Sequence, residues 1–376
     1  MLSSNMKDKL ICARPFQEFQ IMDNGEVYGC CPPWVNRYVL GNILTQSYDE
    51  IWNGEKAKKF RESIHDGSFR FCNEKSCPLL KQKIADVMTV DELLRKGEAS
   101  VISDIMGGKT ELTHSPLYLQ FCYDKTCNLS CPSCREKVIV INGEQKEAAE
   151  HIHEQVTTHY LKDAVHITIT PSGDAFASAL YRTFLQTLTK EMAPNLKNIT
   201  ILTNGLLLKK FWHTLSDYAR EKIGCISVSI DSVTKGNYEI LRRGGVFEDL
   251  LENLQFIKDH IRVNDFSLST VIQKTNYKEF YDFIAFGESY GINGFQFQIL
   301  EPDFHFSQPW FYKWWIENAV HEDKNPLYQD FVSLITKNKI KTGIRVDYGP
   351  LYTIMNGGNI SQSHLVYEEY LKKYPN

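Results

Sequence analysis

Three cysteines in one short segment, Cys127, Cys131 and Cys134, are the residues of this chain most suited to chemistry. They directly follow an apolar run, residues 117–123, that predicts a β-strand. Thiolates this close together can hold three irons of a 4Fe-4S cluster and leave the fourth iron open to a small molecule. Zinc is the alternative for clustered cysteines, but a zinc ribbon needs two cysteine pairs, and the next cysteine downstream is Cys225.

The composition predicts a globular protein without a nucleic-acid or membrane partner. The chain has 376 residues, 43% of them hydrophobic, enough for two or three domains or for one barrel with additions. Its net charge of −4 arises from interspersed acidic and basic residues, whereas nucleic-acid binding needs a concentrated basic face. Residues 1–20 lack the apolar core of a signal peptide, and no run approaches the ~18 apolar residues of a membrane span. We therefore expect a cytoplasmic protein whose cysteines bind metal rather than form disulfides.

Strand and helix patterns alternate between residues 116 and 301. Short runs rich in β-branched and aromatic residues predict strands over 117–123, 165–170, 199–203, 226–231, 266–272 and 294–300. Helical stretches lie between them, for example over 147–161, 175–192 and 277–290. This alternation implies a parallel sheet, and six units are too few to close an eight-stranded barrel. We expect an α/β fold with an open, partial (β/α)6 barrel.

Apolar and polar residues alternate along most of the predicted strands. In the strand over 226–231, Val228 and Ile230 alternate with Ser229 and Asp231. Parallel strands that are buried on both faces have continuous apolar sequences. Polar residues at every second position therefore indicate that one face of the sheet, the inner face, lines a solvated cavity. Ligands in such folds bind at the carboxyl ends of the strands. The alternative is an antiparallel sheet with one face in water.

The other segments flank this barrel. Residues 1–80 are rich in Cys, Gly and Pro and contain one predicted helix over 48–64. Residues 81–115 form a polar, mostly helical connector, and residues 302–376 form a helical extension rich in aromatic residues. We therefore expect an N-terminal Cys-rich domain over 1–80, the connector, the partial barrel over 116–301, and a helical C-terminal extension.

The loops after the predicted strands carry motifs that resemble those of the radical SAM superfamily. Besides the C-x3-C-x2-C cysteines, these are Thr-Asn-Gly-Leu at 203–206, Ser-Ile-Asp at 229–231 and Arg-Arg-Gly-Gly at 242–245. The resemblance implies that Cys127, Cys131 and Cys134 ligate a 4Fe-4S cluster whose open iron binds S-adenosylmethionine (SAM).

The same resemblance assigns SAM contacts to the ends of the strands. Ser172, Gly173 and Asp174 are similar to the family's Gly-Gly-Glu element, which holds the methionine ammonium. The resemblance further implies that Asn204, Ser229 and Asp231 face the ribose or methionine of SAM, and that Arg242 binds the methionine carboxylate. Gln273 is also implied to bind SAM, because the alternation along its strand puts it on the inner face.

The first cysteine group resembles a SPASM or twitch domain, which in the family usually follows the barrel. Its pattern runs C-x12-G-x4-C from Cys12 to Cys30, then through Gly-Asn-Ile and Ile-Trp-Asn to Cys72-x4-Cys77. The resemblance implies one auxiliary 4Fe-4S cluster ligated by Cys12, Cys30, Cys72 and Cys77, with Cys31 spare or in place of Cys30. A structural zinc ion held by the same four cysteines is the alternative.

The resemblance also implies a reaction. Such enzymes cleave SAM reductively, with an electron from a donor such as flavodoxin or ferredoxin, and the 5′-deoxyadenosyl radical then abstracts hydrogen from a substrate C–H bond. The implied outcome is oxidation, cross-linking or epimerisation of a ribosomal peptide. The alternatives are the same chemistry on a sugar or other small metabolite, and a non-catalytic zinc-binding scaffold. Cys122, on the inner parity near the end of the first strand, is a candidate hydrogen donor for an epimerisation.

Overall fold

A computed structural model describes residues 10–74, 77, 79–80, 87–170, 172–301, 309–337 and 340–361. The chain divides into two compact units. The first unit comprises Met1–Thr126, Val140–Ile201 and Thr214–Ile223, and the second unit comprises Cys127–Ile139, Leu202–His213 and Gly224–Asn376. The cysteine triad therefore belongs to the second unit and the N-terminal cysteines to the first.

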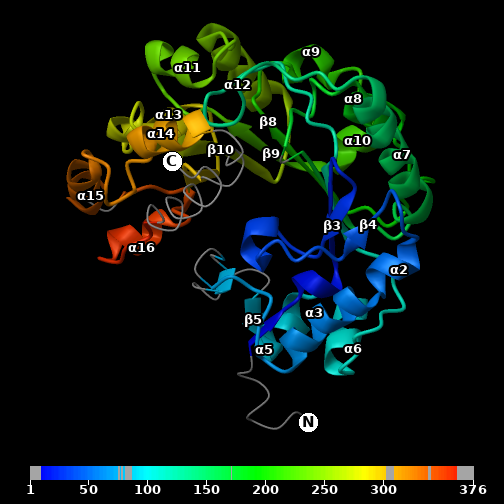
Figure 1. The fold of residues 1–376 in the computed structure, drawn as a ribbon. Coiled ribbons are helices and arrows are strands. Elements are labelled where there is room, and N and C mark those ends of the chain that lie inside the picture. Colours follow the sequence, from blue (N-terminus) through cyan, green and yellow to red (C-terminus); the bar gives the residue numbers. More distant parts are fainter. Residues whose placement is uncertain are drawn as a thin grey trace. The chain divides into compact units, whose positions relative to one another are not determined.

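The first unit is built on a mostly parallel run of strands (Figure 1). The strands are β2 (Glu18–Met22), β3 (Glu26–Tyr28), β4 (Gly41–Asn42), β6 (Tyr118–Cys122), β7 (His166–Ile169) and β8 (Asn198–Thr203). Strands β6, β7 and β8 pair in parallel, β2 pairs in parallel with β6, and β3 and β4 follow antiparallel. A separate pair joins β1 (Leu10–Cys12) to β5 (Val87–Thr89).

Helices cover these strands. They are α2 (Tyr48–Trp52), α3 (Glu55–His65), α5 (Val90–Lys96), α6 (Ala99–Met106), α7 (Gly143–His159), α8 (Ala179–Thr187) and α10 (Asp217–Lys222), with short 3-10 turns at Arg14–Phe16 and Pro32–Val35. The single helix predicted over 48–64 is two helices, because Gly54 adopts an extended backbone between them and caps α3. Helix α3 buries Ala57, Phe60, Arg61 and Ile64, the i, i+3, i+4, i+7 spacing of one helical face.

The second unit contains four strands that all pair in parallel. These are β9 (Ile223–Ser229, all but its first residue), β10 (Asp265–Ile272), β11 (Gly294–Ile299) and β12 (Arg345–Asp347). Its helices are α9 (Leu208–Trp212), α11 (Lys235–Leu241), α12 (Phe247–His260), α13 (Asp282–Ser289), α14 (Pro309–Asn318), α15 (Tyr328–Lys337) and α16 (Leu351–Met355), with a 3-10 turn at Tyr277–Glu279. In Figure 1, α11 and α12 lie on the outer side of β9 and β10.

The predicted α/β fold with a mostly parallel sheet is confirmed. Strands β6 to β11 lie within three residues of the predicted bounds, and their parallel pairing rules out the antiparallel alternative. Two features differ from the prediction. Residues 1–80 contribute β2 directly to the sheet beside β6, and the C-terminal extension, predicted as helical, adds strand β12. Both additions are short strands, which periodicity detects poorly.

The predicted alternation of apolar and polar side chains is also confirmed. In β7 and β8, the side chains of Ile167, Ile169, Ile199 and Ile201 are fully buried. On the opposite face, His166 lies 3.0 Å from the Thr200 hydroxyl and 3.2 Å from the Asn198 amide. One face of these strands therefore belongs to the apolar core and the other is polar and hydrogen-bonded.

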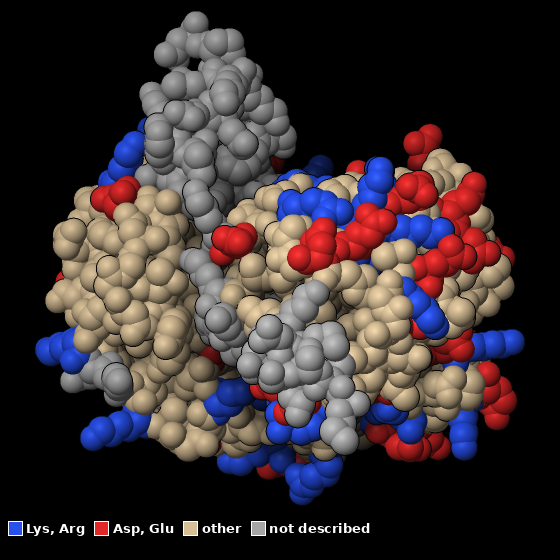
Figure 2. Space-filling model, turned by 90° about the horizontal axis from the view of Figure 1, so that it is seen from below, with Lys and Arg blue, Asp and Glu red and all other residues tan. Residues whose placement is uncertain are grey.

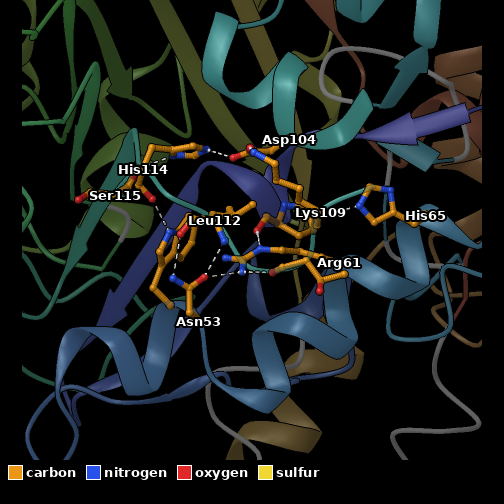
Figure 3. A network of polar contacts seen from close by, with 11 residues as sticks. Asn53, Arg61, His65, Asp104, Lys109, Leu112, His114 and Ser115 are labelled. Carbon is orange, nitrogen blue, oxygen red and sulfur yellow. Dashed lines mark hydrogen bonds and ion pairs between the residues drawn. The ribbon is translucent and has the colours of Figure 1, made fainter. Parts of the chain in front are cut away.

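A polar network centred on Arg61 fixes the connector against helices α2 and α3 (Figure 3). The Arg61 side chain is fully buried, lies 4.4 Å from the centre of the Trp52 ring, and donates to the carbonyl oxygens of Pro15 (2.9 Å) and Thr110 (2.8 Å). The Asn53 side chain bonds both backbone groups of Leu112 at 2.9 Å. The network thus supplies partners to the backbone of an irregular segment.

Charges on the surface are mixed. On the face shown in Figure 2, Lys and Arg side chains lie beside Asp and Glu side chains. Among the described residues, no helix has the length and apolar character needed to cross a membrane.

Candidate iron–sulfur and SAM site

The loop that carries the cysteine triad is held by backbone hydrogen bonds within the second unit. The Cys127 amide donates to Ile139 (2.9 Å), the Cys134 amide to Cys131 (2.9 Å), and the Ser130 amide to the Arg243 carbonyl (3.0 Å). Cys127 and Cys131 are buried, at 7% and 6% exposure, whereas Cys134 is exposed. The loop is therefore ordered by its own turn and by the segment after α11.

Asp231 and Arg242, both predicted from sequence, form a buried ion pair beside Cys131. Arg242 Nε lies 2.9 Å from Asp231 Oδ2, and Arg242 Nη1 lies 3.9 Å from Cys131 Sγ. Burial alone would lower the pKa of Arg242, but the Asp231 carboxylate and the Cys131 thiolate outweigh it and raise the pKa. Burial raises the pKa of Cys131 to about 11, and Arg242 opposes that rise. The guanidinium is therefore a fixed positive charge next to the triad.

The backbone of Asp231 itself is held in an unusual conformation. Its φ of 54° lies in the left-handed region, which is uncommon for a residue with a side chain. The Asp231 carboxylate accepts from the Val271 amide (2.8 Å), and its carbonyl accepts from the Asn276 side chain (2.6 Å). Partners on both sides thus hold the carboxylate toward Arg242.

Gln273 provides a test of whether a polar ligand fits this site. Its side chain is 1% exposed, and neither atom of its amide has a hydrogen-bond partner among the residues that the structure describes. A buried amide without partners costs about 1–3 kcal/mol, so a ligand with polar groups would satisfy it. Together with the three thiols and the Arg242 cation, which suits a carboxylate, this donor set fits a 4Fe-4S cluster with SAM.

Two residues that sequence reasoning missed hold this arrangement in place. The Asn276 side chain accepts from the backbone N–H of Gln273 (2.8 Å) and donates to the backbone carbonyl of Asp231 (2.6 Å). The Glu279 carboxylate, 7% exposed, accepts from the Ser232 hydroxyl (2.8 Å), the Val233 amide (2.8 Å) and other donors of the 232–237 segment. This segment leads from β9 into α11, which ends at Arg242. The only signal in the sequence is that both residues follow the end of a predicted strand.

The remaining residues of the second unit that were predicted to bind SAM lie at strand ends. The Ser229 hydroxyl lies 3.2 Å from the Ser269 hydroxyl across the β9–β10 pair. The Asn204 side chain donates to Asn128 (2.9 Å) and reaches Cys127 Sγ at 3.8 Å. Both residues are thus in the second unit with the triad, and their contact with SAM stays a prediction.

Ser172, Gly173 and Asp174 form a tight turn in the first unit. A Cβ on Gly173 would lie 2.6 Å from the Asp124 carbonyl oxygen, so only glycine fits. The Ser172 hydroxyl donates to the Cys122 carbonyl (2.9 Å), and the fully buried Asp174 carboxylate accepts from two backbone amides of its own turn at 3.0 Å. The turn packs against residues 124–126, and its contact with SAM stays a prediction.

Arg14 lies near two of the N-terminal cysteines, Cys30 and Cys77, in the first unit. Burial raises the pKa of Cys30 and of Cys77, and the Arg14 cation opposes the rise at both, so both thiols lie within its reach. The nearby Cys12 and Cys31 thiols also raise the pKa of Cys30. The pKa of Cys72 is raised to about 12, mainly by burial and to a smaller extent by Cys77. Cys30 therefore lies near Cys12 and Cys31, and Cys72 lies near Cys77, while their joint ligation of one cluster stays a prediction. In the described ranges, no group of three His, Cys, Asp or Glu side chains is arranged to hold a single metal ion.

Cys122, the candidate hydrogen donor, is fully buried in β6. Burial raises its pKa well above the usual value, the Cys31 thiolate adds to this effect, and a hydrogen bond with Gln20 opposes it. The side chain therefore keeps its S–H bond at neutral pH, as a hydrogen-atom donor must.

A cleft of about 410 Å³ opens beside the triad in the second unit. It is lined by Pro132, Arg135, Glu136, Arg243 and Trp314. Trp314 comes from α14, which packs against Leu300 and Val271 at the carboxyl ends of β11 and β10. Arg243 is held by bonds to the Ser130 hydroxyl (3.0 Å) and the Glu136 carbonyl (2.5 Å).

Two family models match the chain, one for each cysteine group. Residues 125–287 match the radical SAM superfamily, and residues 12–78 match SPASM, an iron–sulfur cluster-binding domain. The chain thus carries a radical SAM domain and, N-terminal to it, a SPASM domain. The two domains imply a SAM-binding 4Fe-4S cluster, an auxiliary iron–sulfur cluster and SAM as cofactors. The two matches support the prediction of a radical SAM enzyme.

Similar proteins include GTP 3′,8-cyclases. The enzyme of Alkaliphilus metalliredigens is 28% identical over 141 residues, 37% of this chain and 42% of the relative. That of Peptoclostridium acidaminophilum is 28% identical over 179 residues, 45% and 50% of the two chains. The chain thus spans half or less of these relatives. Among solved structures, Streptococcus suis SuiB bound to precursor peptide SuiA has a TM-score of 0.40 and 13% identity, covering 86% of this chain and 69% of SuiB.

Proposed function

We propose that this protein cleaves SAM reductively at the Cys127–Cys131–Cys134 site and uses the product radical to abstract hydrogen from a substrate C–H bond. The observation that carries the proposal is the Arg242 cation, which is paired with Asp231 at 2.9 Å and lies 3.9 Å from Cys131 Sγ. A buried cation beside Cys131 supports a role of Arg242 at the methionine carboxylate and of Cys131 as a ligand of the cluster.

The bound groups supply the chemistry: one electron from the reduced cluster breaks the C5′–S bond of SAM, giving methionine and a 5′-deoxyadenosyl radical. The residues of the chain orient the reactants. Arg242 neutralises the carboxylate of SAM, Asp231 keeps Arg242 in place, and the Gln273 amide offers a donor and an acceptor in a buried position. Burial of these groups excludes water, which protects a radical from side reactions.

The test is SAM turnover by anaerobically reconstituted protein. With a low-potential reductant, the wild-type protein should convert SAM to 5′-deoxyadenosine without added substrate. The Cys131→Ala variant removes one ligand and should form none, while Cys225→Ala, which changes a cysteine outside both groups, should match the wild type. Equal product in Cys131→Ala and wild type would refute the proposal.

For the substrate, we propose first a ribosomal peptide that is oxidised, cross-linked or epimerised. The support is the auxiliary-cluster domain, whose cluster can accept the electron of a substrate radical, and Cys122 as a donor in the case of epimerisation. A peptide encoded beside the gene should increase 5′-deoxyadenosine formation. If the reaction is an epimerisation, Cys122→Ala should keep forming 5′-deoxyadenosine but lose the altered peptide, and unchanged peptide product would eliminate Cys122.

A small anionic metabolite is the second candidate, and the cleft beside the triad favours it. Arg135 and Arg243 place two cations beside the Trp314 ring, against one acidic residue, Glu136. This lining suits a phosphate or carboxylate attached to a planar group. GTP is the probe, since the relatives act on it: reduced protein with SAM should consume GTP, and Arg243→Gln should raise the KM. An absence of GTP consumption alongside active SAM cleavage would remove GTP and favour the peptide.

A further inference from the structure

Each sulfur of the cysteine triad faces a nitrogen donor from a different part of the chain. Asn204 Nδ2 lies 3.8 Å from Cys127 Sγ, and Arg242 Nη1 lies 3.9 Å from Cys131 Sγ. Arg135 differs, because both its Nε and its Nη2 donate to Cys134 Sγ, at 3.4 and 3.3 Å. Of these three sets of contacts, those of Arg135 are the shortest, and they fall on the one exposed cysteine of the triad.

Arg135 brings a positive charge into direct contact with the triad. Its guanidinium stays protonated throughout the ordinary pH range and donates twice to Cys134 Sγ. Arg135 is thus a permanent cation at one sulfur of the triad. Arg242 is a second cation nearby, but the Asp231 carboxylate at 2.9 Å compensates its charge.

We propose that Arg135 is a positioning residue that sets the reduction potential of the SAM-binding cluster. Potentials of such clusters depend on net charge, on hydrogen bonds to the sulfurs and on solvent exposure. When a low-potential carrier supplies one electron, the cluster with its thiolates becomes one charge more negative. The Arg135 cation and its two N–H···S bonds stabilise that reduced form more than the oxidised form. Arg135 therefore raises the potential and makes the first electron transfer easier.

The inference rests on the proposed role of Cys127, Cys131 and Cys134 as cluster ligands. The experiment is a redox titration of the reconstituted holoprotein followed by electron paramagnetic resonance. The signal that changes on addition of SAM reports the SAM-binding cluster, and iron content is measured first for every variant.

Two substitutions of Arg135 are compared with one matched control. Arg135→Gln should lower the midpoint potential, with about a tenfold smaller reduced-to-oxidised ratio at a fixed potential, which is about 59 mV for one electron. Arg135→Lys keeps the charge but not the fork of donors, so its shift should have the same sign and be smaller. Lys137→Gln removes one positive charge from the same loop at an exposed position and should leave the potential unchanged.

The outcomes separate this inference from the proposed function. A wild-type protein without a SAM-responsive signal would overturn both. A wild-type signal whose potential is the same in Arg135→Gln, or shifts equally in Lys137→Gln, would overturn the role of Arg135 alone. If Arg135→Gln fails to assemble the cluster, the test uses Arg135→Lys instead. A midpoint potential of Arg135→Lys equal to that of the wild type would contradict a role for the N–H···S bonds.

Discussion

At the scale of single residues, the buried pair of Asp231 and Arg242 connects the fold to the chemistry. The two side chains are 2% and 13% exposed, and the pair lies beside Cys131, a proposed ligand of the cluster. Removing one partner of a buried pair is costly, because the other charge stays in a poorly solvated place. The pair should therefore be sensitive to changes that hardly alter its shape.

Asp231→Asn tests this sensitivity. Asparagine can still accept from the Val271 amide but leaves Arg242 without its counter-charge, so the free energy of unfolding should fall by about 3 kcal/mol. Under the proposed role of Arg242 at the methionine carboxylate, the 5′-deoxyadenosine yield should fall as well, because Asp231 no longer holds the guanidinium in place. Thermal unfolding of the anaerobic holoprotein and product yield are measured together. Asp217→Asn, at a carboxylate that is 98% exposed, is the control and should behave as the wild type. Equal losses in the two variants would contradict the prediction.

A second residue-scale prediction concerns His153 on α7. Its Nδ1 lies 2.8 Å from the Tyr123 hydroxyl, and burial lowers its pKa to about 4, from 6.5 in an exposed imidazole. The unfolded chain therefore binds the proton more tightly than the folded one. Stability from neutral His153 is fully present above pH 6.5 and is lost as pH falls toward 4, by about 3 kcal/mol in total.

His153→Gln removes this titration while keeping a partner for Tyr123. The difference in unfolding free energy between wild type and His153→Gln should change by about 3 kcal/mol between pH 7 and 4, measured by urea denaturation. His151→Gln, two positions away and 51% exposed, should show no such change. A pH-independent difference for His153→Gln would mean that its imidazole titrates alike in both states.

At the scale of elements, the Arg61 network shows how helix α3 organises the first unit. Arg61 occupies a core position of the helix, and burial lowers its pKa to about 9, which still leaves it charged at neutral pH. Its side chain donates to Pro15, Thr110 and Asn53. The Arg61 side chain thus links three parts of the chain: the turn after Cys12, the end of α2, and the connector.

Arg61→Met keeps the volume of the side chain but leaves buried carbonyl groups without donors. The free energy of unfolding should fall by about 3 kcal/mol. Arg70→Met, just after the same helix, removes an arginine that is 41% exposed and pairs with Asp66, and should cost less than about 1 kcal/mol. Chemical denaturation of both variants is the measurement. A similar cost for the two would show that the network does not hold the connector.

Sequence patterns predicted the elements well and their polar connections poorly. The strands and both cysteine groups follow from local alternation and spacing, which a single sequence displays directly. Asn276 and Glu279 could not be predicted, because their partners come from residues 231–237 and depend on the pairing of β9 with β10. From sequence alone, Arg61 would be assigned to the solvent-exposed face of an amphipathic helix, because the acceptors that allow its burial lie far away in the sequence. Strand β2 was not predicted, because it is short and its partner, β6, lies about a hundred residues further along the chain.

At the scale of the whole molecule, the two cysteine groups belong to different compact units. Cys127, Cys131 and Cys134 lie in the second unit, and the five N-terminal cysteines, Cys31 included, lie in the first. Each group has its own cation, Arg135 or Arg14, within reach of its thiols. Two clusters built in this way should assemble independently of each other.

Iron and sulfide content of selected variants tests this independence. The wild-type protein should bind about eight irons, and loss of either cysteine group should remove about four. A Cys127→Ala, Cys131→Ala, Cys134→Ala variant should keep the auxiliary cluster but form no 5′-deoxyadenosine. A Cys72→Ala, Cys77→Ala variant should keep the SAM-responsive signal, because its triad, Arg242 and Gln273 are untouched, and should still cleave SAM. About four irons and one zinc in the wild type would instead indicate zinc at the N-terminal cysteines. Loss of all iron in either variant would show that the two sites depend on each other for assembly.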